Sequence, residues 1–108
     1  MKHTKILDQL LIWLAESPND PFLLYGIATE YRKTEAETAV RYYEKLLENF
    51  PDYVATYYHA ASLYAEIGET EKARKTYEKG IEICKKLNEN KLLAELRNAY
   101  EDFLDNLE

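Results

Sequence analysis

The chain has 108 residues, 46% of them hydrophobic and 31% charged, which is ordinary for one small globular domain with its own core. Its formal net charge is −6, which disfavours nucleic-acid binding because that function needs a basic face, and its apolar runs are too short to span a membrane. One cysteine cannot form an internal disulfide, so we expect a protein of a reducing compartment, the cytoplasm.

Six helical segments are predicted, because residues with high helix propensity are abundant and strand-like alternation is absent. The first is expected over residues 4–17, and Pro18 ends it. Its apolar side chains share one broad arc at 100° per residue, formed by Ile6, Leu7, Leu10, Leu11, Trp13 and Leu14. The second is expected from Pro21 to about Arg32, with Asp20 as its N-cap.

The next two predicted helices are delimited by polar caps and by a glycine. Thr34, followed three residues later by Glu37, is typical of a capping box and predicts a third helix that runs to about residue 49. Asp52 is expected to cap the fourth helix, and Gly68 is expected to end it in a left-handed conformation.

The fifth helix is expected to begin with Thr70 as its cap, and the polar run 88–90 is the predicted break before a sixth. One long bent helix is the alternative, since neither Pro nor Gly marks a stop there. The sixth segment divides cleanly into a polar and an apolar side, which is typical of a helix that closes the end of a stack. Its apolar side is formed by Leu92, Leu93, Leu96, Ala99, Tyr100, Phe103, Leu104 and Leu107.

The chain repeats itself at a spacing close to one helical hairpin. With a shift of 34 residues, Ala39 and Tyr43 fall on Ala73 and Tyr77. With a shift of 33 residues, the matches are Tyr25 with Tyr58, Ala28 with Ala61, and Tyr31 with Tyr64. A period in this range is typical of stacked helical repeats, whose units bury surface against their neighbours.

The matched positions resemble the signature of the tetratricopeptide repeat family. One copy reads Tyr57-x-x-Ala60-Ala61-x-x-Tyr64, then Gly68, Ala73-x-x-x-Tyr77 and Gly80; the other reads Leu24-x-x-Ile27-Ala28-x-x-Tyr31, Ala39-x-x-x-Tyr43 and Pro51. The resemblance implies an all-α fold, a right-handed superhelix of antiparallel helix hairpins with about six helices. Small residues are expected where paired helices approach most closely, which explains a glycine in mid-helix at Gly80.

We expect a single domain over residues 1–108, organised by this repeat. The two repeats cover about residues 21–87, and a half-repeat stands on either side, each amphipathic enough to act as a cap. The parts are an N-terminal flanking helix at 1–20, the first repeat at 21–53, the second repeat at 54–87 and a capping helix at 88–108.

The resemblance also implies where a partner would bind, because in this family the first helix of each pair lines a concave groove that receives peptides or partner helices. Candidates belong to those helices but lie off the core stripe. On the fourth helix they are Ala55, Tyr58, Ser62 and Glu66, at i, i+3, i+7 and i+11. On the second they are Phe22, Tyr25, Thr29, Arg32 and Lys33, and the sixth adds Lys91, Asn98 and Asp102. Aromatic anchors, hydroxyls and both charges suit peptide recognition.

Two narrower interpretations bear on these candidates. Some family members bind chaperone C-terminal carboxylates through Lys and Asn on their groove helices; here Tyr25 and Thr29 occupy comparable places, which disfavours that use. The alternative for the whole set is that its tyrosines are ordinary surface or core residues rather than a binding surface.

The sequence carries no recognisable catalytic, metal or cofactor site. His3 and His59 have no Cys or second His at ligand spacing, so neither is expected to bind a metal or to catalyse. Cys84 shares an apolar stripe with Ala73 and Tyr77 and is expected to be a buried small hydrophobe. A glycine-rich phosphate loop is absent. We therefore expect neither an enzyme nor a cofactor.

The expected function is a protein–protein interaction module that binds a peptide or partner helix in a concave groove. Nucleic acid and membranes are not expected as partners. Two alternatives stay open, a small dedicated chaperone or assembly subunit for one partner, and a self-associating structural unit. A monomer is expected if both ends are capped, and a homodimer is the alternative.

Overall fold

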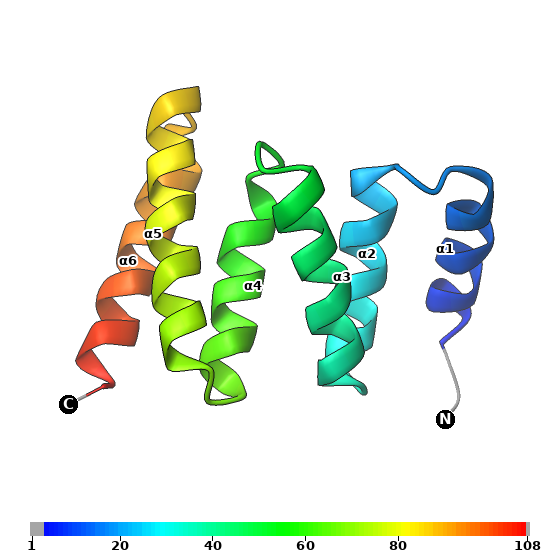
Figure 1. The fold of residues 1–108 in the computed structure, drawn as a ribbon, viewed down its shortest axis with the longest axis horizontal. Coiled ribbons are helices and arrows are strands. Elements are labelled where there is room, and N and C mark those ends of the chain that lie inside the picture. Colours follow the sequence, from blue (N-terminus) through cyan, green and yellow to red (C-terminus); the bar gives the residue numbers. More distant parts are fainter. Residues whose placement is uncertain (1–3, 108) are drawn as a thin grey trace. The chain divides into compact units, whose positions relative to one another are not determined.

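A computed structural model describes residues 4–107, and these residues form six α-helices and no strand (Figure 1). The chain divides into two compact units, Met1–Tyr53 and Val54–Glu108. The first holds α1 (Lys5–Glu16), α2 (Pro21–Arg32) and α3 (Ala36–Asn49), and the second holds α4 (Ala55–Glu66), α5 (Thr70–Leu87) and α6 (Asn90–Asp105). The expected all-α architecture built from helix hairpins is confirmed, as is the separation of the fifth and sixth helices.

Several helix ends follow the local chemistry that the sequence indicated. The Thr4 hydroxyl accepts the Leu7 N–H at 3.0 Å and caps α1, and an Asp20 carboxylate oxygen accepts the Phe22 N–H at 2.9 Å and caps α2. Gly68, beyond the end of α4, has a φ of 84°, the left-handed conformation that glycine adopts without steric cost. Asn88 has a φ of 60° and ends α5 in the same region, which asparagine tolerates.

Three of the expected caps are wrong. The residue before α3 is Glu35 rather than Thr34, because the turn after α2 is closed by backbone bonds in which the Thr34 and Glu35 N–H groups both donate to the Tyr31 carbonyl. Asp52 lies in a backbone turn and α4 begins only at Ala55; Thr70 is already the first residue of α5. None of these three helices has a side-chain cap bond.

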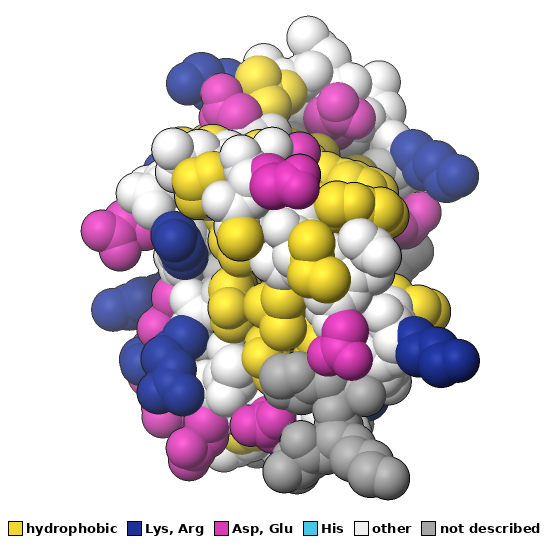
Figure 2. All heavy atoms as spheres, turned by 90° about the vertical axis from the view of Figure 1, so that its right-hand side faces the viewer, with side chains coloured by type: hydrophobic (Ala, Val, Ile, Leu, Met, Phe, Trp, Pro, Cys, Tyr) yellow, Lys and Arg dark blue, Asp and Glu magenta, His cyan; other side chains and the backbone are white. Residues whose placement is uncertain are grey.

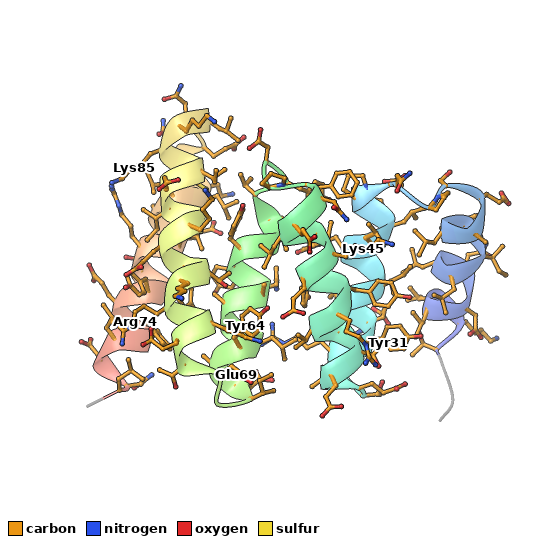
Figure 3. All side chains as sticks on the ribbon, viewed as in Figure 1. Tyr31, Lys45, Tyr64, Glu69, Arg74 and Lys85 are labelled. Carbon is orange, nitrogen blue, oxygen red and sulfur yellow. The ribbon has the colours of Figure 1, made fainter. Side chains whose placement is uncertain are left out.

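The first unit is built on the pairing of α2 with α3, and α1 packs against α2. The rings of Tyr31 on α2 (labelled in Figure 3) and Tyr42 on α3 stack with their centroids 5.7 Å apart. A Cβ atom built on Gly26 would lie 3.3 Å from Cδ1 of Leu10, so α1 and α2 approach closely there. The side chains of this unit with at most 1% exposure are Leu24, Ile27, Ala28, Ala39, Tyr43 and Leu46.

The second unit pairs α4 with α5, and α6 packs on both. At Gly80 α5 approaches α4 closely, because a Cβ atom there would lie only 2.6 Å from Cβ of Tyr57 and 3.2 Å from Cδ1 of Leu96 on α6. Real Cβ atoms do not come this close, so the position requires glycine. The core of this unit includes Tyr57, Ala60, Ala61, Leu63, Ala73, Cys84 and Leu96.

The apolar faces of the two end helices are less buried than expected. Leu7 is the buried residue of α1, whereas Ile6 is 62% exposed and Trp13 is 49% exposed. Figure 2 faces this helix and shows hydrophobic side chains gathered over it. In α6, Leu96 and Phe103 are buried, whereas Leu107 is 43% exposed. The expected arcs exist, but burial along them is uneven: Leu10, Leu11 and Leu14 are half-buried, and Leu107 lies beyond the end of α6.

The burial of Tyr43 predicts that the folded protein becomes less stable in alkaline solution. Burial raises the pKa of its hydroxyl, and the hydrogen bond to Thr29 and the charge of Arg32 oppose the shift in part. A tyrosine with a raised pKa in the folded state keeps its proton when the unfolded chain has lost it, so the free energy of unfolding should fall as the pH rises through about 10. Urea denaturation at stepped pH values measures this slope, and Tyr43→Phe should reduce it; an unchanged slope would contradict the assignment.

Candidate functional site

The second unit carries an open hollow of about 720 Å³, lined by side chains from all three of its helices. From α4 come Tyr58, Ser62, Ala65 and Glu66; from α5 come Thr70 and Tyr77; from α6 and its end come Glu95, Asn98, Ala99, Asp102, Phe103, Asn106 and Leu107. We call this set the α4–α6 hollow. It lies where α4 and α6 contact each other, beside the contact of Tyr77 with Phe103, whose rings have centroids 5.5 Å apart.

The structure brings several predicted site residues together in this hollow. Tyr58, Ser62 and Glu66 line it from α4, and Asn98 and Asp102 line it from α6. Tyr58 is 36% exposed, and the centroids of its ring and the His59 ring lie 5.4 Å apart in an edge-to-face arrangement. Two further candidates of this unit, Ala55 and Lys91, are not among the lining residues.

The candidates on α2 lie in the first unit and differ in exposure. Phe22 is 66% exposed, and Lys33 is exposed and pairs with Glu30 at 3.0 Å. Tyr25 is half-buried, with its ring 5.8 Å from that of Tyr53. The set is completed by Thr29 and Arg32, both half-buried.

Thr29 also has a structural task. Its hydroxyl donates to the Tyr25 carbonyl at 2.9 Å and lies 3.1 Å from the Tyr43 hydroxyl, so it joins α2 to α3. A residue that holds two helices together in this way offers less of its hydrogen-bonding capacity to a partner.

Sequence reasoning missed three polar residues of the hollow, Thr70, Glu95 and Asn106. With Asn98 and Asp102, the last two occupy i, i+3, i+7 and i+11 along α6 and its end, the same spacing that selected the candidates on the fourth helix. Counted from Lys91, the predicted candidate, the same spacing selects Ala94 instead, so it does not by itself single out Glu95. Tyr77 and Phe103, which were expected in the core, are buried and contribute their rings to the base of the hollow.

Comparison with known proteins identifies the family. The model of the tetratricopeptide repeat family matches residues 32–83. Solution and crystal structures of a tetratricopeptide repeat domain protein from Salinibacter ruber share 40% identity with the chain at a TM-score of 0.75; they cover 80% and 82% of this chain, which covers 88% and 100% of theirs. The chain belongs to the tetratricopeptide repeat family.

A more distant structure agrees on the fold of this tetratricopeptide repeat protein. A Bordetella parapertussis protein shares 16% identity at a TM-score of 0.81, covering 95% of this chain and 90% of its own. A search of curated proteins finds no match. Members of the family are generally non-catalytic and typically bind other proteins, so the repeat scaffold indicates a protein-interaction module.

Groups that could support other functions are scarce in this tetratricopeptide repeat protein. Among residues 4–107, no cluster of His, Cys, Asp and Glu could hold a metal ion. Over the same described stretch, no helix is long and apolar enough to cross a membrane. His59 is half-buried, with its ring beside Tyr58, and His3 lies outside the described residues.

Cys84 is fully buried in α5, as expected for a small core residue, and this predicts low reactivity. Burial raises the pKa of its thiol, and the nearby Glu89 carboxylate adds to the shift. Since the thiolate is the reactive form, we expect a chromogenic thiol reagent to react at least about tenfold more slowly with the native protein than with the urea-unfolded chain. Equal rates in the two states would show that Cys84 is accessible.

Proposed function

We propose that this protein is an interaction module that binds a peptide segment or helix of a partner protein in the α4–α6 hollow. The observation that carries the proposal is the hollow itself, which brings Tyr58, Ser62, Asn98 and Asp102 from two helices to one surface. The exposed side of α2, with Phe22, Tyr25, Arg32 and Lys33, is proposed as a further contact surface of the same module.

The chemistry of the hollow supports peptide binding. Its volume of about 720 Å³ falls in the range of ligand sites, and its lining combines the aromatic rings of Tyr58, Tyr77 and Phe103 with polar side chains. Tyrosine is enriched among the residues that carry most binding energy at interfaces, since it joins a large apolar ring to a hydroxyl. Asn98 and Asn106 offer donors and acceptors that can bond to an extended backbone.

A peptide selection tests the proposal. The full chain would be immobilised and exposed to a random-peptide display library, and enriched peptides would be synthesised and mapped by chemical-shift perturbation on the labelled protein. We expect the largest perturbations at the lining residues of the α4–α6 hollow. Tyr58→Ala should weaken binding by about tenfold, the loss typical of a central aromatic anchor.

A matched pair of variants controls this experiment. Asn98→Trp places an indole in the hollow and should block the peptide, whereas Ala94→Trp places the same side chain at an exposed position of α6 outside the hollow. Both variants should unfold at temperatures close to that of the wild type. If Asn98→Trp binds as tightly as Ala94→Trp, or if no peptide is enriched, the proposal is wrong.

Self-association is the second candidate function, and the exposed apolar side chains of the first unit favour it. Ile6, Ile12 and Trp13 of α1 and Phe22 of α2 are between 49% and 66% exposed. Apolar surface of this kind can be covered by a second copy of the chain. Sedimentation at micromolar concentration measures the mass; a dimer that Trp13→Ala converts to monomer would support this candidate, and a monomeric wild type would exclude it.

A further inference from the structure

The charged side chains that line the α4–α6 hollow are all acidic. They are Glu66 on α4 and Glu95 and Asp102 on α6. The segment 54–108 contains eight Lys and Arg residues, yet none of them lines the hollow. Because the described lining residues include three carboxylates and no basic side chain, the hollow favours an occupant of positive charge.

Basic side chains of α5 are engaged elsewhere in the second unit. Nε of Arg74 lies 3.2 Å from a Glu71 carboxylate oxygen, on the part of α5 labelled in Figure 3. Nζ of Lys79 pairs with Glu82 at 3.2 Å, and Nζ of Lys72 lies 5.8 Å from the centre of the Tyr64 ring. Arg74 also hydrogen-bonds to Tyr100 on α6, and none of these three basic residues is among those that line the hollow.

The base of the hollow adds a second kind of complementarity. Tyr77 and Phe103 contribute aromatic rings there, and Tyr58 stands 36% exposed at the side. Lysine and arginine combine a long apolar stem with a cationic end, so the stem can cover the rings while the end reaches a carboxylate. A small inorganic cation would use the carboxylates but not the rings.

We propose that the segment bound in the α4–α6 hollow carries a lysine or arginine side chain whose cationic end is held by Glu95 and Asp102. The proposal rests on the proposed function, and it specifies the chemistry of the peptide. Acidic segments, including free C-terminal carboxylates, are disfavoured by the same carboxylates because like charges repel.

The test uses peptides selected on the full chain from an unbiased library. One position at a time would be changed to Lys, Arg, Gln and Glu, and affinity would be measured by fluorescence anisotropy. At one position, Lys or Arg should bind about fivefold to tenfold more tightly than Gln, and Glu should bind most weakly. This preference should shrink as NaCl is raised from about 0.05 M to about 0.5 M.

Two double variants of α6 give a matched control. Glu95→Gln with Asp102→Asn removes two negative charges from the hollow and should abolish the preference for Lys and Arg. Glu101→Gln with Asp105→Asn removes the same charges from exposed positions of the same helix that do not line the hollow, and should retain the preference. If both double variants lose the preference for Lys and Arg to a similar extent, the effect is a general one of net charge, and the inference is overturned.

The outcomes separate the inference from the proposed function. Peptides that bind the hollow equally well with Lys, Gln and Glu would overturn the inference and leave the interaction module standing. Peptides that prefer an acidic residue would do the same. If no peptide binds the hollow, the proposed function fails, and the inference fails with it.

Discussion

Replacing Tyr43 with alanine is expected to destabilise the protein by about 3–5 kcal/mol, the usual cost of removing a large buried ring. Tyr43 is 1% exposed on α3, and its hydroxyl lies 3.1 Å from that of Thr29 on α2. The change would therefore leave a cavity between the helices of a hairpin and remove the hydrogen bond between Tyr43 and Thr29, whose hydroxyl would keep only its bond to the Tyr25 carbonyl. Urea denaturation at neutral pH measures the loss.

Two milder variants separate the ring from the hydroxyl. Tyr43→Phe keeps the ring and should cost about 1 kcal/mol, the typical net value of one hydrogen bond. Adding Thr29→Val to Tyr43→Phe also removes the Thr29 hydroxyl and should cost little more, since that hydroxyl no longer has Tyr43 as a partner. A cost for Tyr43→Ala no greater than that for Tyr43→Phe would mean that the ring is not packed in the core.

Alanine substitution at two mid-helix glycines should change stability in opposite directions. At Gly80 we expect a loss of about 1–3 kcal/mol, because the new Cβ atom would lie 2.6 Å from Cβ of Tyr57, an atom fixed to the backbone of α4. The better helix propensity of alanine, worth about 1 kcal/mol, offsets only part of that strain.

At Gly26 the same change should stabilise the protein by about 0.5–1 kcal/mol. The nearest atom there is Cδ1 of Leu10 at 3.3 Å, the end of a flexible side chain that can move by a few tenths of an ångström. Thermal and urea denaturation of both variants against the wild type measure the difference. A stabilising Gly80→Ala, or equal effects at both sites, would contradict the close approach of α5 to α4.

The sequence was sufficient for the order of the helices and for ends that depend on local chemistry. Proline, the Asp20 cap, Gly68 and the break near Asn88 act within a few residues of where they stand. The N-terminal caps of α3, α4 and α5 could not be predicted in the same way. There, backbone bonds of the preceding turn, such as those to the Tyr31 carbonyl, decide where the helix begins.

The extent of burial was the weaker part of the prediction. Periodicity shows that Ile6 and Trp13 share an arc with Leu7, but not how far the neighbouring helix reaches across that arc. Of the three, Leu7 alone is buried in the structure. For the hollow, periodicity selected Tyr58, Ser62 and Glu66 on α4; on α6 the same spacing, counted from Lys91, selects Ala94 rather than Glu95.

The contact at Gly80 also limits how this part of the chain can vary. The obstacle to a side chain at position 80 is Cβ of Tyr57, which every residue except glycine possesses. A smaller side chain at 57 therefore cannot compensate for a larger one at 80, as it could in an ordinary core contact. A larger residue at position 80 requires α4 and α5 to move apart. Cδ1 of Leu96 on α6 lies 3.2 Å from the position of a Cβ atom at residue 80, so α6 would have to shift as well. The side of the hollow that α6 forms would then change. The lack of a side chain at Gly80 therefore helps to set the spacing of the helices that form the hollow, although Gly80 is not one of its lining residues.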